Sequence, residues 1–148
     1  MNLRQCLLTV GLCAVVGTAP AVTLISLQEM QASMAATEPF TAKASPLPGA
    51  PVIEVISPRL NAPITSPSSI ELLFQPAAHS AVRPETFRVL YGRLRLDITQ
   101  RLLSATPITA RGITVKEASL PKGSHRLLLS IEDTEGRQGQ KVLELEVN

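Results

Sequence analysis

The chain has few aromatic residues and no cysteine beyond its first residues. Among 148 residues there is no Trp, one Tyr and three Phe. Both cysteines, Cys6 and Cys13, lie near the start of the chain, so the remaining sequence can form neither a disulfide nor a zinc site with thiolate ligands. These absences exclude an antibody-type domain, whose core contains a disulfide and a Trp, and they predict a core of aliphatic side chains.

Positive and negative charges are also nearly balanced in the sequence. The sequence contains 14 Lys and Arg against 12 Asp and Glu, which gives a formal net charge of +2 at pH 7. A dedicated nucleic-acid-binding protein is expected to have a strongly basic face. We therefore predict that nucleic acid is not among the partners of this chain.

Charged residues are absent from most of the N-terminal segment. None occurs from Cys6 to Leu27, a run of 22 residues, and Arg4 is the only charged residue before it. Such a run is typical of a secretory signal peptide or of a membrane-spanning helix. We predict that residues 1–36 are a signal peptide or an N-terminal membrane anchor, and that the protein is periplasmic or secreted.

The sequence leaves the fate of this segment open. Small residues of the kind found before a signal-peptide cleavage site occur at residues 19–21 (Ala-Pro-Ala) and again at residues 33–35 (Ser-Met-Ala). An uncleaved segment would anchor the chain in the inner membrane through residues 6–27. Lipid attachment at Cys13 is a third possibility, although the residues before it match a lipoprotein signal poorly. In each case we expect membrane contact only through this segment.

Residues 37–51 have the composition of a linker. They read TEPFTAKASPLPGAP and contain four prolines without an apolar period. Proline-rich segments are extended and act as spacers between a domain and its point of attachment. We predict a disordered tether over residues 37–51 and a folded domain over residues 52–148.

Apolar and polar residues alternate along most of the predicted domain. The alternation has the period of a strand with one buried face. It predicts about seven strands, near residues 53–55, 70–74, 87–91, 94–98, 113–115, 127–131 and 142–147. The phase changes at Gly92, where we predict a hairpin, and residues 97–103 are predicted to form one helical turn at most. The fold class that follows is all-β: a single immunoglobulin-like β-sandwich, preceded by an apolar N-terminal helix and a Pro-rich linker.

Two stretches of the sequence resemble families of exported sandwich domains. Residues 120–137 (LPKGSHRLLLSIEDTEGR), with residues 97–99 and 112–115, resemble the last strands of bacterial immunoglobulin-like domains. This resemblance implies the fold and not a function, because it marks turns and strand phase. Residues 57–74 are similar to the copper-resistance CopC-like domain, a family that carries copper in the periplasm.

The ligands that the CopC-like resemblance implies are missing from this chain. That family implies a mature N-terminal histidine with further His, Asp or Met ligands. Here the only histidines are His79 and His125, and all three methionines precede the tether. The resemblance therefore implies the fold without its copper chemistry, and we predict no metal ligand and no cofactor.

The reactive side chains of the predicted domain are not grouped as a catalytic site requires. His125 is in phase with the apolar residues of its strand, so its ring is predicted to point into the sandwich and bond a loop carbonyl. His79 lies in a loop and is predicted to be exposed. Ser124 and His125 are neighbours on a strand and point to opposite faces, so with Asp133 they cannot form a triad. Asp133 is instead predicted to cap a turn, and we predict that the chain is not an enzyme.

Three arginines form the one candidate binding face. Arg88, Arg93 and Arg95 lie at outward positions of two predicted strands. Arginines on one face of a sheet can bind carboxylates or phosphates, which would suit a protein or an anionic envelope polymer. The alternative is a solvated face balanced by carboxylates such as Glu144 or Glu146.

These features favour a non-catalytic interaction or structural module of the bacterial periplasm or cell envelope. Two other functions stay open. One is a periplasmic metal carrier of the CopC type, and the other is an accessory subunit of an envelope enzyme whose chemistry lies in another chain.

Overall fold

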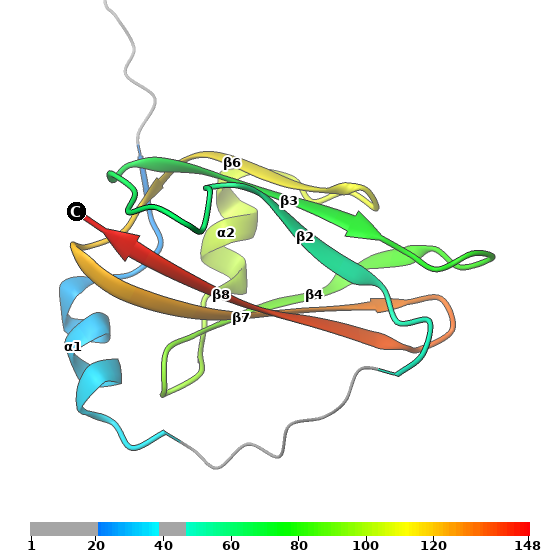
Figure 1. The fold of residues 1–148 in the computed structure, drawn as a ribbon, viewed down its shortest axis with the longest axis horizontal. Coiled ribbons are helices and arrows are strands. Elements are labelled where there is room, and N and C mark those ends of the chain that lie inside the picture. Colours follow the sequence, from blue (N-terminus) through cyan, green and yellow to red (C-terminus); the bar gives the residue numbers. More distant parts are fainter. Residues whose placement is uncertain (1–20, 39–46) are drawn as a thin grey trace, which may run out of the picture.

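The chain folds as two four-stranded sheets that pack face to face around one apolar core (Figure 1). The computed structural model describes residues 21–38 and 47–148. The elements are, in chain order, β1 (Val22–Thr23), α1 (Leu27–Ala35), β2 (Val52–Ser57), β3 (Ser68–Gln75), β4 (Val82–Tyr91), β5 (Leu96–Asp97), α2 (Thr99–Ala105), β6 (Gly112–Ser119), β7 (Gly123–Asp133) and β8 (Gln138–Val147). The prediction of an all-β sandwich is confirmed.

The chain crosses between the two sheets three times, after β3, after β5 and after β6. One sheet has the order β1-β6-β3-β2 and the other has the order β5-β4-β7-β8. Neighbouring strands run antiparallel, except that β1 pairs in parallel with β6. The helix α2 follows β5 and leads the chain to β6 in the other sheet.

The core is built from alternate residues of the long strands, as their sequence pattern predicts. Phe74 of β3 and Phe87 of β4 meet across the two sheets with ring centroids 5.4 Å apart. The other inward residues of these strands and of β6, β7 and β8 include Ile70, Leu72, Val89, Tyr91, Ile113, Val115, Leu127, Leu129, Ile131, Leu143, Leu145 and Val147, each at most 5% exposed. Aliphatic side chains therefore make up most of the core, as the shortage of aromatic residues implies.

The hairpin predicted at Gly92 is present, but the helix after it is longer than predicted. Gly92 has a φ of +62° and opens the turn between β4 and β5. The Asp97 carboxylate accepts the N–H of Thr99, the first residue of α2, at 2.9 Å. Leu102 then packs into the core. The prediction of one turn at most was wrong: α2 has seven residues, and burial of its inner side is what sustains it.

The folded unit includes residues that precede the boundary predicted at Val52. Within the range 1–36 assigned to a targeting segment, β1 and α1 pack on the sandwich, and Leu24 and Ile25 between them are 0% and 1% exposed. The predicted apolar helix and tether fall largely on residues 1–20 and 39–46, outside the described residues. Neither helix that the structure does describe is long and apolar enough to cross a membrane.

Candidate functional site

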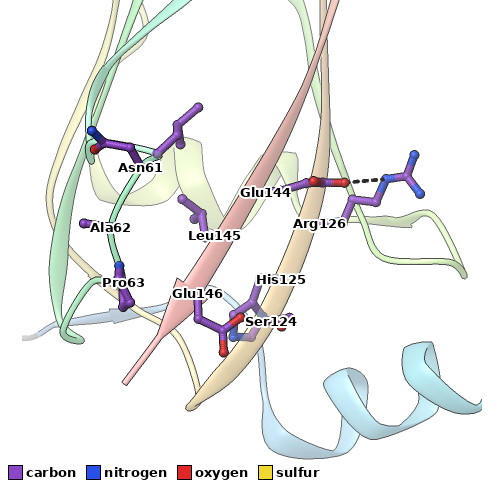
Figure 2. A pocket seen from close by; sticks show the side chains of 10 residues that line it. Asn61, Ala62, Pro63, Ser124, His125, Arg126, Glu144, Leu145 and Glu146 are labelled. Carbon is purple, nitrogen blue, oxygen red and sulfur yellow. Dashed lines mark hydrogen bonds and ion pairs between the residues drawn. The ribbon is translucent and has the colours of Figure 1, made fainter.

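A groove of about 440 Å³ lies beside the hairpin of β7 and β8 (Figure 2). One wall is the loop between β2 and β3, and the other is formed by residues 124–126 and 144–146 of the two strands. The lining residues are Leu60, Asn61, Ala62, Pro63, Ser124, His125, Arg126, Glu144, Leu145 and Glu146. The groove therefore combines an apolar loop wall with a charged strand wall.

The loop wall is held in place by backbone hydrogen bonds to the end of β8. The Ile64 N–H donates to the Glu146 carbonyl at 2.8 Å, and the Asn148 N–H donates to the Ile64 carbonyl at 2.9 Å. These two bonds form a parallel bridge between Ile64 and Val147. Pro58, Pro63 and Pro67 restrict the same loop further, because proline fixes its own φ. The groove is thus bounded by backbone that is tied down on both sides.

The strand wall places opposite charges next to each other. The register of β7 and β8 pairs Arg126 with Glu144 and Ser124 with Glu146. The Arg126 Nε lies 3.8 Å from Glu144 Oε1, and the Arg126 guanidinium also bonds Glu38. The Ser124 hydroxyl donates to the Glu146 carboxylate. Figure 2 shows the ion pair between Arg126 and Glu144, with the loop residues Asn61, Ala62 and Pro63 on the other side of β8.

His125 lies at the inner end of the groove and is held by two hydrogen bonds. Its ring is 3% exposed; Nε2 lies 2.7 Å from the Pro121 carbonyl and Nδ1 lies 2.9 Å from the Tyr91 hydroxyl. Because a carbonyl can only accept, Nε2 carries the hydrogen and Nδ1 accepts from Tyr91. Burial, with the Glu29 carboxylate, raises the pKa of Tyr91, so its hydroxyl keeps the proton it donates. The predicted carbonyl contact of His125 is confirmed.

The Tyr91 partner of His125 was missed by the sequence analysis. Both residues occupy inward positions of their strands, which was a visible signal. The pairing itself depends on register, since Tyr91 lies opposite Leu127, two residues along β7 from His125. Sequence alone does not specify that register.

The three arginines predicted to form a binding face do not all lie on paired strands. Arg88 is in β4, whereas Arg93 and Arg95 lie in the turn before β5. The Arg93 guanidinium donates to the carbonyls of Met34 and Ala36, both at 3.2 Å. Arg93 is therefore used to hold the end of α1.

Arg88 and Arg95 also have local interactions. The Arg88 guanidinium donates to the Phe87 carbonyl at 3.1 Å. The pKa of Asp97 is lowered mainly by two hydrogen bonds from Thr99, and the charge of Arg88 lowers it further. Arg95 has a φ of +51° in the turn, and it too interacts with another group of the protein. Whether the arginines bind a ligand stays a prediction.

The remaining candidates are found where the sequence predicts them. His79 is exposed in the loop between β3 and β4. Asp133 is fully buried and accepts the N–H groups of Glu135 and Arg137 at 3.0 and 2.9 Å. Burial opposes ionisation of this carboxyl, but the Arg137 backbone and guanidinium outweigh it and hold its pKa at about 2. Ser124 is exposed whereas His125 is buried, as neighbours on a strand should be.

No three His, Cys, Asp or Glu side chains of residues 21–38 and 47–148 come together in a way that could hold a metal ion. The fold and the groove define a β-sandwich domain with a groove between the β2–β3 loop and the charged hairpin of β7 and β8. No protein-family model, curated protein or solved structure matches the chain.

Proposed function

We propose that this chain is a non-catalytic binding module of the cell envelope, exported by its N-terminal segment, that holds a segment of a partner protein in the groove beside β7 and β8. The observation that carries the proposal is the groove itself. An apolar wall and a wall of paired charges meet there at exposed positions, and such combinations are typical of protein contact surfaces.

The order of the strands supports an immunoglobulin-like sandwich for this module. If β2, β3 and β6 are taken as strands A, B and E, the second sheet reads C′, C, F and G from β5 to β8. Constant-type domains have a strand D beside strand E. Here β1 takes that position, because α2 occupies the connection that would otherwise supply strand D.

The charges of the groove favour a protein over an anionic polymer. Its charged lining residues are Glu144, Glu146 and Arg126, and the guanidinium already contacts Glu144 and Glu38. A polyanion would meet two carboxylates at close range, which is unfavourable. A polypeptide can place a Lys or Arg against the carboxylates and an apolar side chain against Leu60, which is 46% exposed.

Site-specific crosslinking in cells tests this proposal. A photoreactive amino acid replaces Asn61 in the groove or, as the matched control, exposed Lys116 on the outer face of the other sheet. We expect a discrete protein adduct from position 61 that position 116 does not give. Equal adduct patterns from the two positions would remove the groove as the binding site.

The identified partner then allows a quantitative test. Reversing charge with Glu144→Lys and Glu146→Lys should slow association with the purified partner and make it less sensitive to salt, because exposed charges mainly steer encounter. Leu60→Ser should mainly accelerate dissociation. Unchanged rates in all three variants would contradict a contact through this groove.

A further inference from the structure

The residues just after the uncharged N-terminal run belong to the core of the domain. β1 pairs with β6 through Val22 and Thr23. The Leu24 N–H then donates to the Ser119 carbonyl at 3.1 Å, and the side chains of Leu24 and Ile25 are 0% and 1% exposed. Both side chains are as fully buried as those at the centre of the sandwich, so residues 22–25 are part of the domain core.

An ion pair joins α1 to α2 next to this buried segment. The Arg101 guanidinium bonds both carboxylate oxygens of Glu29, at 2.6 and 2.8 Å, and also donates to the Leu24 carbonyl at 3.0 Å. Ser26 caps α1, since its hydroxyl accepts the Glu29 N–H while the Glu29 carboxylate accepts the Ser26 N–H. One guanidinium therefore holds the backbone before α1 and the first turn of the helix together.

The far end of α1 is held by the turn between β4 and β5. The buried Ser33 hydroxyl accepts the Arg93 N–H at 2.9 Å, and the Arg93 side chain reaches the last carbonyls of the helix as described above. Gly92 allows this close approach, because a Cβ at that position would lie 1.9 Å from the Ser33 hydroxyl oxygen. Both ends of α1 are thus fixed to the sandwich.

These contacts distinguish between the two candidate cleavage sites, one after Ala21 and the other after Ala35. A cut after Ala35 would remove Leu24, Ile25 and Met30 from the core and leave Arg101 without its carboxylate. Among the described residues, a cut after Ala21 would remove only Ala21 itself, which is exposed and precedes β1.

The contacts also shorten the run available to cross a membrane. With residues 22–25 in a strand and the core, and with Pro20 disfavouring helix at its end, the uncharged run available as a helix is 6–19. These 14 residues would span about 21 Å as a helix, against a hydrocarbon core of about 30 Å. That length is typical of the apolar part of a cleaved signal peptide.

We propose that the chain is cut by a signal peptidase after Ala21, so that the mature protein begins at Val22 and keeps β1 and α1 as part of its domain. This inference rests on the export that the proposed function includes. The peptidase would hydrolyse the peptide bond between Ala21 and Val22: the oxygen of a water molecule joins the Ala21 carbonyl carbon to give the carboxylate, and the Val22 nitrogen leaves with a proton as the new amino group.

The experiment is to express the full chain with a C-terminal tag in a bacterial host, separate the cell fractions and measure the intact mass and N-terminal sequence. We expect a periplasmic protein that begins at Val22. Ala21→Leu should leave most of the protein as uncut precursor in the membrane fraction, because the peptidase requires a small residue before the cut. Ala35→Leu, a matched control at an exposed helical position, should leave the product unchanged.

The alternative outcomes are distinct. A periplasmic product that begins at Ala36, a lipid-modified product that begins at Cys13, or an uncut wild-type chain that stays in the membrane would each overturn this inference while leaving export intact. A soluble uncut chain in the cytoplasm would overturn the inference and the proposed export together.

Discussion

Leu24→Ala tests whether the N-terminal segment is part of the domain. The Leu24 side chain is 0% exposed, and large-to-small substitutions at such sites cost about 2–5 kcal/mol through lost burial and the cavity left behind. That cost is a large fraction of the total of about 5–15 kcal/mol that stabilises a typical domain. At a urea dependence of about 2 kcal/mol per molar, the unfolding midpoint should fall by about 1–2.5 M.

The chain provides its own reporter and control for this measurement. Tyr91 is the only Tyr, there is no Trp, and Tyr91 is buried in the core. Its fluorescence can follow urea unfolding beside far-UV circular dichroism. Leu27→Ala removes the same side chain three residues later, where it is 55% exposed, and should shift the midpoint only slightly. Equal midpoints for the two variants, measured with identical N-termini, would refute the assignment of Leu24 to the core.

Three further predictions concern the contacts around this segment. The Arg101 guanidinium lowers the pKa of Glu29 from 4.5 to about 2, so the ion pair stabilises the fold fully above pH 4.5 and loses its effect as the pH falls toward 2. Urea midpoints of wild type and Glu29→Gln should therefore differ at neutral pH and converge over that range; a gap that does not change with pH would contradict this. Tyr91→Phe removes the donor to the buried His125 Nδ1 and should cost about 1–3 kcal/mol, visible as a melting temperature several degrees lower, whereas exposed Ser124→Ala should change it little. Gly92→Ala should destabilise more than Gly136→Ala in the same melting assay, because both glycines have positive φ but only a Cβ at position 92 meets Ser33, at 1.9 Å from its oxygen; equal losses would show that backbone strain alone matters.

The alternating residues were a reliable guide to the inner faces of the long strands. Ile70, Leu72 and Phe74 are buried as predicted, and so are Leu127, Leu129 and Ile131. Alternation succeeds there because a strand with one solvated face has a period of two that no other element shares. The Asp133 turn was predictable for a similar reason, since the carboxylate and its partners are local in sequence.

The N-terminal elements were not predicted, because an apolar, uncharged run is typical both of a targeting segment and of a buried strand. The segment before Ser26 is apolar and uncharged, and that composition serves a membrane and a protein interior equally well. One local signal was present: Ser26 is followed three residues later by Glu29, the pattern of a capping box. The structure contains that capping box at the start of α1.

Arg93 shows why surface predictions from strand phase are weaker than core predictions. An outward position is open to solvent only if nothing else in the chain covers it. Arg93 reaches the carbonyls of Met34 and Ala36, which lie 59 and 57 residues away in the chain. Contacts of that separation depend on topology, and no local pattern around Arg93 encodes them.

The one charged residue in the N-terminal part of the folded unit takes part in the contacts that hold α1. Between Arg4 and Glu38 the sequence contains one charged residue, Glu29, and it is the residue that Arg101 binds. A carboxylate is costly inside a membrane, whereas here it caps a helix and pairs with a cation of the domain. Residues 26–35 are therefore part of the domain. Residues 22–25 are part of it too, because β6 and the core bind them.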